Sequence, residues 1–256
     1  ERADRAHLRP LVGLMDLGIA DRVAVVTGAA SGIGRATARR LALEGCRVVA
    51  VDRQPIEPDA DEFGPSPISI AADVSDALSV RAMIAATEAA FGRLDILVCS
   101  AGVFETSGPF DLGVEEWDRV HSVNLRGAFL CAQAAVPLMS RTRWGRIVLV
   151  SSMAAQTGGM AAGAAYVASK AGVMGLARSL AVHAGPLGIT VNCVNPGSIE
   201  TPMTANVERE ALAARTPLRR NGTAEDVADI IAVLGSERAG FVTGAHLSIN
   251  GGLVAD

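Results

Sequence analysis

Several residue types are scarce in this chain of 256 residues, and each shortage narrows what the protein can be. Aromatic residues make up only 4% of it, so the core must be built mainly from aliphatic side chains and alanine, as is typical of helices packed on a parallel sheet. The cysteines are Cys46, Cys99, Cys131 and Cys193. Because they lie far apart, with neither metal-site spacing nor the density of a disulfide scaffold, we predict free thiols, a cytoplasmic location and no metal.

A strong excess of charge is also lacking. The net charge of -4 and the pI near 5.6 give no electrostatic reason to expect a nucleic acid or an anionic membrane as partner. The longest uncharged stretch, residues 147–169, is long enough to cross a bilayer, but its serines and glycines would be costly in hydrocarbon. We therefore predict small-molecule ligands, no nucleic acid and no membrane span.

The chain divides into a short extension and one domain. Residues 1–14 mix acids with arginines, and the apolar run that follows is too short for a signal peptide, so we interpret them as a flexible N-terminal extension. Residues 15–256 are predicted to form a single domain, because one α/β core organises roughly 200 to 250 residues. Within it, residues 201–222 follow a strand end and carry Pro202, Pro217 and Gly222, which favours a substrate lid.

Apolar β-branched runs alternate with longer alanine-rich segments of helical period. Strands are predicted at residues 23–26, 47–51, 68–71, 96–98, 146–150, 190–194 and 246–249. Helices are predicted near residues 33–44, 77–91, 114–140, 165–184 and 224–234. Between the second and third strands, prolines predict a crossover helix that is short or absent, and a loop is favoured. This alternation predicts an α/β fold of Rossmann type, a doubly wound parallel sheet of about seven strands with helices on both faces.

A glycine-rich turn follows the first strand, where Thr27 to Gly34 read TGAASGIG. Glycines at Gly28, Gly32 and Gly34 permit a tight turn, a close approach of a pyrophosphate to the backbone, and close packing of the next helix. The free amides at the start of that helix can then bind phosphates. A glycine cluster alone is weak, but a strand before it, a helix after it and an acid at the next strand end favour a dinucleotide site.

That acid is Asp52, which lies 18 positions after Gly34. A carboxylate at the end of the second strand can accept hydrogen bonds from the adenosine ribose hydroxyls and repels a 2'-phosphate, so NAD is predicted in preference to NADP. Arg53 could offset this repulsion, but no arginine or lysine lies within the glycine turn to help it. Asp73, with Val74, follows the third strand and is interpreted either as a neighbour of the adenine or as a helix N-cap near Asp76.

The chain has one tyrosine, Tyr166, and one lysine, Lys170, and they are four positions apart. On a helix this spacing places both side chains on one face. A nearby ammonium stabilises a phenolate and lowers the phenol's pKa, so Tyr166 could exchange a proton near neutral pH. The alternative is a surface pair at helical spacing.

Two further positions favour the catalytic interpretation. Ser151 and Ser152 end the strand before the Tyr166 helix, where a hydroxyl can polarise a substrate carbonyl, although a serine there is often only a turn residue. Asn124 falls inside a predicted long helix, where asparagine is a poor helix former and indicates a local distortion or a polar role.

Together these segments resemble the single-domain members of the short-chain dehydrogenase/reductase superfamily. TGAASGIG, NLRG around Asn124, the serine pair, YVASK and NPGSIETP occur in that family's order between about Leu17 and Gly252. The resemblance implies that Ser152 orients the carbonyl, Tyr166 transfers the proton and Lys170 holds the ribose and tunes Tyr166. It also implies that Asn124 anchors a water for proton relay.

The resemblance implies that Ile199 and Thr201 hold the nicotinamide carboxamide. With the turn and strand ends, the predicted cofactor residues are Gly28, Ser31, Gly32, Ile33, Gly34, Asp52, Arg53, Asp73, Val74, Ser100, Ala101, Gly102, Tyr166, Lys170, Pro196, Gly197, Ile199 and Thr201. Two departures stand out. The family's usual Asn-Asn-Ala-Gly is Cys99 to Gly102 here, and Ser152 lies 14 positions before Tyr166, one more than the commonest spacing.

The substrate is not fixed by the family, because variable loops form the pocket. Candidate walls are Gln156, Met160, Met203 and Val207, beside Ser152 and Tyr166. Leu130 and Leu187 occupy the places where acyl-carrier-protein reductases carry docking arginines, which favours a free alcohol or ketone. The prediction is an NAD-dependent enzyme that interconverts a secondary alcohol and a ketone. The alternatives are a 3-oxoacyl reductase using NADPH and a non-catalytic dinucleotide-binding protein, and the resemblance also implies a homotetramer or homodimer.

Overall fold

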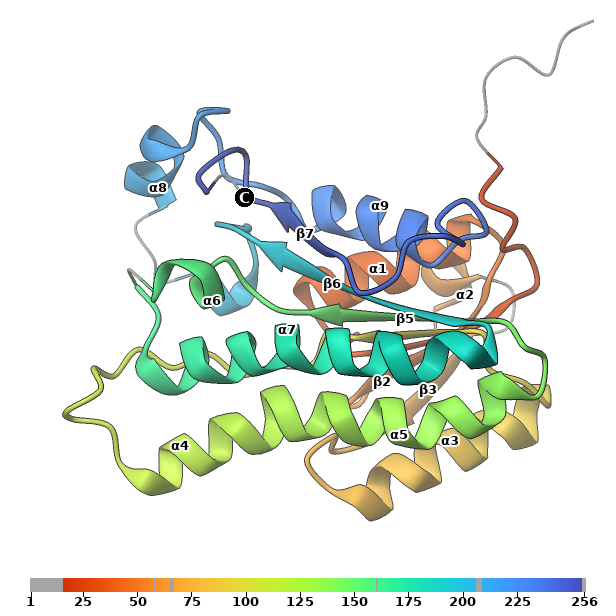
Figure 1. Ribbon diagram of the computed structural model, residues 1–256. Coiled ribbons are helices and arrows are strands. Elements are labelled where there is room, and N and C mark those ends of the chain that lie inside the picture. Colours follow the sequence, from red (N-terminus) through yellow and green to blue (C-terminus); the bar gives the residue numbers. More distant parts are fainter. Residues whose placement is uncertain (1–15, 58, 65–66, 160, 206–208, 255–256) are drawn as a thin grey trace, which may run out of the picture.

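The computed structural model describes residues 16–57, 59–64, 67–159, 161–205 and 209–254. The expected extension at residues 1–14 and the predicted substrate residues Met160 and Val207 lie outside the described residues. Seven parallel strands form one sheet in the order β3-β2-β1-β4-β5-β6-β7 (Figure 1). They are β1 Val23–Thr27, β2 Arg47–Asp52, β3 Ile68–Ala71, β4 Ile96–Cys99, β5 Gly145–Val150, β6 Ile189–Pro196 and β7 His246–Ile249. The predicted fold class is confirmed.

Helices cover both faces of this sheet (Figure 1). On one face α3 Ala77–Phe91, α5 Gly127–Ser140 and α7 Ala164–Ala184 pack into a core of aliphatic side chains from alternate strand positions. On the other face α1 Gly32–Leu43, α2 Ala60–Phe63 and α9 Ala224–Leu234 enclose the second core. The central strands β1, β4, β5 and β6 are buried along their whole length, which explains their near-continuous apolar sequences.

Two local predictions need correction. The long helix expected at residues 114–140 is interrupted: α4 Val114–His121 and α5 are joined by a π-helical turn, Ser122–Arg126. Asn124 lies inside this turn, so its poor helix propensity did mark a distortion. Between β2 and β3 the expected loop contains the short helix α2, because the Asp59 side chain caps it and Phe63 is buried beneath it.

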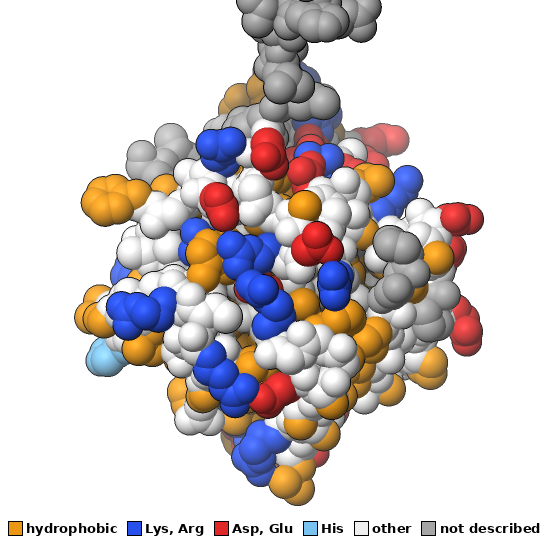
Figure 2. Space-filling view, turned by 90° about the vertical axis from the view of Figure 1, so that its right-hand side faces the viewer, with side chains coloured by type: hydrophobic (Ala, Val, Ile, Leu, Met, Phe, Trp, Pro, Cys, Tyr) orange, Lys and Arg blue, Asp and Glu red, His pale blue; other side chains and the backbone are white. Residues whose placement is uncertain are grey.

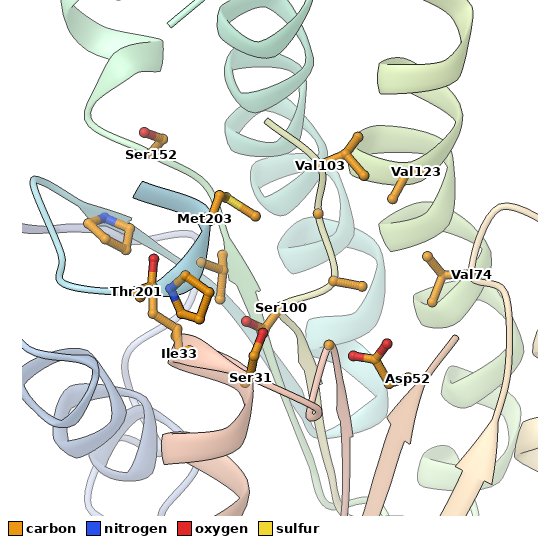
Figure 3. Close-up of a pocket in the computed structure, with 18 of the residues that line it drawn as sticks. Ser31, Ile33, Asp52, Val74, Ser100, Val103, Val123, Ser152, Thr201 and Met203 are labelled. Atoms are coloured by element: carbon orange, nitrogen blue, oxygen red, sulfur yellow. The ribbon is translucent and has the colours of Figure 1, made fainter. Parts of the chain in front are cut away.

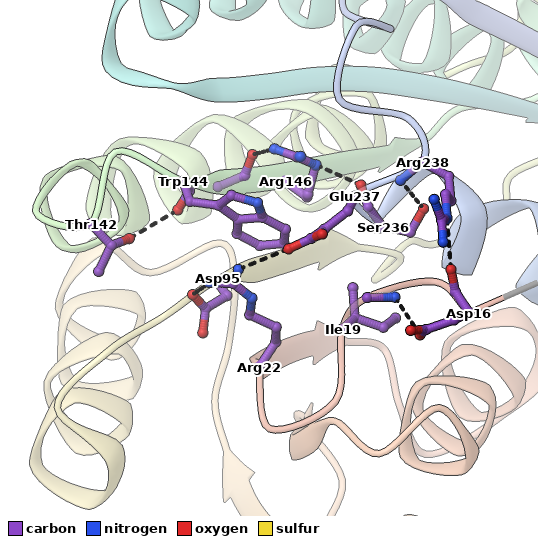
Figure 4. Close-up of polar contacts among 12 residues, drawn as sticks. Asp16, Ile19, Arg22, Asp95, Thr142, Trp144, Arg146, Ser236, Glu237 and Arg238 are labelled. Atoms are coloured by element: carbon purple, nitrogen blue, oxygen red, sulfur yellow. Dashed lines mark hydrogen bonds and ion pairs between the residues drawn. The ribbon is translucent and has the colours of Figure 1, made fainter.

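The amino ends of the strands form an edge rich in paired arginines. Figure 2 looks at this side of the molecule and shows cationic side chains grouped near its middle, with acids between them. The Trp144 ring lies between two guanidinium groups, with Arg22 at 3.9 Å and Arg146 at 4.2 Å from its ring (Figure 4). Asp95 is fully buried beside them and pairs with Arg22 and Arg93. Two guanidinium groups therefore compensate the buried Asp95 carboxylate.

The strand order reverses between β1 and β4, since the chain passes from β3 at one edge back to the middle of the sheet. Ligands of open α/β sheets bind outside the carboxyl ends of the strands at such a reversal. The arrowheads of β5 and β6 in Figure 1 point to this edge. Among the described residues, no helix is long and apolar enough to cross a membrane.

Candidate active site

A cleft of about 310 Å³ opens at the carboxyl ends of β1 and β4. Every residue of the predicted cofactor site lines it, from the glycine turn after β1 to the segment after β6. Figure 3 shows Asp52 at one end of the cleft and Ser152 at the other, with Ser31 and Ser100 between them. The cleft is therefore long enough to bring an acid at β2 and the serine after β5 into one elongated site.

The turn between β1 and α1 has no room for side chains at two of its glycines. Gly28 has φ +75°, and a Cβ there would lie 2.8 Å from the Ala101 backbone nitrogen. A Cβ at Gly34 would overlap the Gly28 carbonyl oxygen, because α1 packs directly on the turn. The first amides of α1 consequently face the cleft at short range, which is the geometry that binds a pyrophosphate. The residues present fit a dinucleotide.

The acids at the adenosine end are held by backbone amides. Asp52 accepts hydrogen bonds from the amides of Ala30 at 3.1 Å and Gln54 at 3.0 Å, so its carboxylate is fixed beside the glycine turn. Asp73 lines the cleft and accepts from the Ser75 hydroxyl at 2.7 Å, and this bond lowers the pKa of Asp73. The N-cap of α3 is Asp76. Asp73 therefore lines the cleft, and the N-cap of α3 lies three residues further on.

Thr27 holds the turn after β4, a role that the sequence did not suggest. Its hydroxyl oxygen accepts hydrogen bonds from the amides of Ser100 and Ala101, each at 3.2 Å. These two amides belong to the segment in which the family's asparagine pair is replaced by Cys99 and Ser100. Because Thr27 is 1% exposed and bonds only to backbone atoms here, the turn keeps its shape without the asparagine side chains.

Tyr166 and Lys170 lie on the buried face of α7, and both line the cleft. The Lys170 Nζ lies 5.7 Å from the centre of the Tyr166 ring and donates a hydrogen bond to the Val150 carbonyl at 2.8 Å. Ser152, on the loop after β5, lines the same cleft and influences the pKa of Tyr166. The structure thus brings the lone phenol, the lone ammonium and the strand-end hydroxyl to the same end of one cleft.

The pKa values of this group differ from the sequence-based expectation. Burial raises the pKa of Tyr166, and the Ser152 hydroxyl opposes this only in part. Burial also lowers the pKa of Lys170 to about 8. The expectation that Lys170 lowers the pKa of Tyr166 is therefore wrong for the protein without ligands. The reason is that burial dominates the pKa of Tyr166, and that Lys170 is itself desolvated and donates its hydrogen bond to Val150.

Asn124 lies one layer behind the cleft. Its side-chain oxygen accepts from the Val103 amide at 2.8 Å, and its Nδ2 donates to the Val103 carbonyl at 3.0 Å and to the Ser169 hydroxyl at 3.1 Å. The Ser169 hydroxyl in turn donates to the Tyr166 carbonyl at 2.8 Å. The Asn124 side chain therefore ties the loop after β4 to α7, and Ser169 is a contact that its sequence position did not single out.

Only some of the residues predicted to form the substrate pocket line this cleft. Met203 lines the cleft near Ser152 (Figure 3). Gln156 does not line this cleft, because its amide donates to the Ser248 hydroxyl at 3.4 Å. Two residues near the reacting end were missed: Val103 lines the cleft, and the Phe104 ring packs edge-on against Tyr166 with 5.0 Å between ring centres. Neither has a sequence signal beyond its place after the glycine of the β4 turn.

A dinucleotide cleft that ends at a phenol, a hydroxyl and an ammonium is the arrangement of a nicotinamide-dependent oxidoreductase, and known proteins of that kind are similar to this chain. The family described as enoyl-(acyl carrier protein) reductase matches residues 28–254. A cis-4-hydroxycyclohexanecarboxylate dehydrogenase of Sinomonas cyclohexanicum is 43% identical over 247 residues, which cover 92% of this chain and 98% of that protein.

Two further comparisons agree with this. The 3-oxoacyl-(acyl-carrier-protein) reductase FabG of Staphylococcus aureus is 40% identical over 239 residues, covering 90% of this chain and 97% of that protein. A crystal structure of a short-chain type dehydrogenase/reductase from Mycobacterium marinum has a TM-score of 0.88 at 31% identity, covering 94% and 98% of the two chains. The chain belongs to the short-chain dehydrogenase/reductase superfamily. It is an oxidoreductase of hydroxyl and keto carbons with a nicotinamide dinucleotide as cofactor.

Proposed function

We propose that this chain is an NAD-dependent dehydrogenase that interconverts a secondary alcohol and a ketone, with Tyr166 as the acid/base. The observation that carries the proposal is that Ser152, Tyr166 and Lys170 line the same cleft as the glycine turn. The bound nicotinamide ring accepts or supplies the hydride. Ser152 binds the substrate oxygen, and Tyr166 accepts the hydroxyl proton during oxidation and returns it during reduction.

Lys170 and Asn124 support this step. Lys170 leaves the Val150 carbonyl for the ribose hydroxyls of the cofactor, where its ammonium stabilises the phenolate form of Tyr166. Asn124 holds the loop after β4 in place and anchors a water that passes the proton toward solvent. Ile199 and Thr201, which line the cleft after β6, hold the carboxamide of the nicotinamide.

Replacing Tyr166 tests the acid/base directly. Tyr166→Phe removes only the hydroxyl, so we expect kcat to fall by about 10²- to 10⁴-fold with a panel of secondary alcohols, while NAD affinity changes little. Rates are measured from cofactor reduction, and affinity from nucleotide titration. Equal cofactor consumption by wild type and Tyr166→Phe would contradict the mechanism.

The preference for NAD rests on Asp52, whose carboxylate lies at the adenosine end beside the glycine turn. We expect the wild type to bind NAD more tightly than NADP. Asp52→Ala should weaken NAD binding by about 10-fold or more, because a charge-assisted hydrogen bond is lost, and should narrow the difference between the two nucleotides. Asp61→Ala, in the exposed first turn of α2, is the control. Tighter binding of NADP by the wild type would overturn the assignment.

The substrate is proposed to be a free, largely apolar alcohol or ketone. Support comes from the apolar side chains of Val103, Val123 and Met203 in the cleft and from the similarity to a hydroxycyclohexanecarboxylate dehydrogenase. The second candidate, a 3-oxoacyl thioester, is favoured by the similarity to the acyl-carrier-protein reductase. Rates with cyclohexanol derivatives and with an acetoacetyl thioester, compared on one preparation, discriminate between the two.

Assembly into a homodimer or homotetramer in the cytoplasm completes the proposal. Large apolar side chains are exposed on the helical layer, among them Phe129 at 40% and Val182 at 72%. Such surfaces are typical of contacts between copies. Light scattering after size-exclusion chromatography should give a mass of two or four chains.

A further inference from the structure

The loop after β4 carries a buried acid that the proposed mechanism does not use. Glu105 is 6% exposed, although most glutamates lie at the surface. Its Oε1 accepts a hydrogen bond from the Ser107 amide, and its backbone carbonyl accepts one from the Gly163 amide at 2.7 Å. Among the described residues, no donor is bonded to the buried Oε2. A carboxylate in this state needs a compensating field.

That field comes from the helix that carries the reacting groups. Gly163 is the N-cap of α7, a helix of 21 residues, and has no side chain of its own to cap the first turn. The Glu105 carboxylate lies directly against Gly163, because a Cβ there would overlap both of its oxygens. The positive end of the helix therefore stabilises the buried anion. Arg119 of α4 contributes a second, longer-range attraction.

The contact fixes the first turn of α7 to the loop. Besides the bond from Gly163 to Glu105, the Ala164 amide donates to the Ser107 carbonyl at 3.2 Å. Tyr166 is the third residue of this helix, so its backbone belongs to the turn that is held. The preceding loop residue, Phe104, packs on the Tyr166 ring. Glu105 therefore follows the residue that packs on the Tyr166 ring, and its partner Gly163 precedes Tyr166 by three residues.

We propose that Glu105 is a positioning residue whose buried carboxylate holds the start of α7 and thereby keeps the Tyr166 hydroxyl aligned with Ser152. The inference rests on the proposed role of Tyr166. It makes Gly163 the partner of Glu105: Gly163 has φ -80° and ψ 172°, which an alanine adopts without strain, so only the space taken by the carboxylate excludes a side chain there.

A double-mutant cycle tests this pairing with the alcohol that the wild type oxidises fastest. Glu105→Ala should lower kcat by between about 10- and 100-fold, since small misplacements of a reacting group cost this much. Gly163→Ala should do the same by displacing the carboxylate. The double variant should be no slower than Glu105→Ala, because the added methyl group then occupies vacated space. Losses that multiply would overturn the pairing.

Two other measurements, the pH dependence of kcat and the Kd for NAD, distinguish a positioning role of Glu105 from a purely structural one. If Tyr166 moves away from Ser152, it loses the influence of the hydroxyl that opposes its raised pKa. The rise of kcat with pH should then occur at higher pH, while the Kd for NAD stays within about twofold. Glu115→Ala, an exposed carboxylate in the first turn of α4, is the matched control and should leave both unchanged. An unmoved limb, or a kcat within twofold of wild type, would refute the proposal. If Tyr166→Phe is as active as the wild type, the proposed function fails instead.

Discussion

At the scale of single residues, Lys170 is the side chain whose environment is least favourable to its charged form. It is 4% exposed, and within the described residues its Nζ has a carbonyl as hydrogen-bond partner and no carboxylate. Burial therefore lowers its pKa from the ordinary 10.5 to about 8. A cation in this position destabilises the fold, and it lines the cleft in which the proposed function places the cofactor ribose.

This gives a prediction for stability. Since the pKa of Lys170 is lower in the folded chain than in the unfolded chain, the folded state binds fewer protons between about pH 8 and 10.5, and its stability contribution rises with pH through that window. Below pH 8 the full penalty applies. Lys170→Met should therefore raise the free energy of unfolding by about 1 to 3 kcal/mol at pH 7, with the gain fading toward pH 10.5.

Urea unfolding of both proteins at pH 7 and 9.5 measures this difference, and comparing the two removes the effect of the buried cysteines, whose pKa values are also shifted. The variant should be nearly inactive, so stability and activity move in opposite directions. A variant less stable than the wild type at pH 7 would show that the bond to Val150 outweighs desolvation.

At the scale of elements, the glycine turn and α1 depend on one close approach. Gly34 leaves space for the Gly28 carbonyl oxygen, which a methyl group would overlap. We expect Gly34→Ala to lower the free energy of unfolding by about 1 to 3 kcal/mol, because the helix must move off the turn, and to weaken NAD binding more than the loss of stability alone explains.

Gly175 provides the comparison within a helix. Nothing lies within 4 Å of a Cβ at Gly175, in the middle of α7, so Gly175→Ala should stabilise the helix by up to about 1 kcal/mol. Calorimetry and nucleotide titration on both variants measure the two effects. Similar behaviour of the two would mean that packing on Gly28 is unimportant.

The elements themselves were largely predictable from the sequence. Strands β3 and β7 and helices α3 and α9 begin and end at the predicted residues, since buried β-branched runs and apolar helical periods have few other solutions. The misses depend on tertiary contacts. The π-helical turn around Asn124 is held by Val103 and Ser169, which are distant in sequence, and α2 is formed by the burial of one phenylalanine.

The same division applies to the site. All residues predicted to bind the cofactor line the cleft, and most of them lie at the carboxyl end of a strand or at the start of a helix, where motifs are easy to find in a sequence. Contacts that depend on packing between loops were not predicted. They are the hydrogen bond from the Ser100 amide to Thr27, the ring contact between Phe104 and Tyr166, and the hydrogen bond from Gln156 to Ser248. No periodicity or motif encodes such pairs.

At the scale of the whole molecule, the two edges of the sheet have separate tasks. The carboxyl edge carries the cleft, with desolvated groups that cost stability. The amino edge carries Asp95, whose carboxylate accepts hydrogen bonds from the Val23 amide at 2.9 Å and from Arg22 and Arg93 (Figure 4). Bonds from Asp95 thus join β1, β4 and the segment before each of them, at a distance from any reacting group.

Asp95→Ala should therefore lower stability without lowering the rate constant. The change leaves a buried amide and two arginines without their acceptor, and because both arginines are partly exposed we expect a loss of about 2 to 4 kcal/mol. Asp21→Asn, which removes the exposed ion pair with Arg47 and keeps a residue that tolerates the positive φ of this position, should change stability by less than about 1 kcal/mol. Chemical unfolding and kcat are measured on both. A fall in kcat with Asp95→Ala at a temperature where the variant is folded would mean that the two edges are coupled through the strands, and the division of tasks would be wrong.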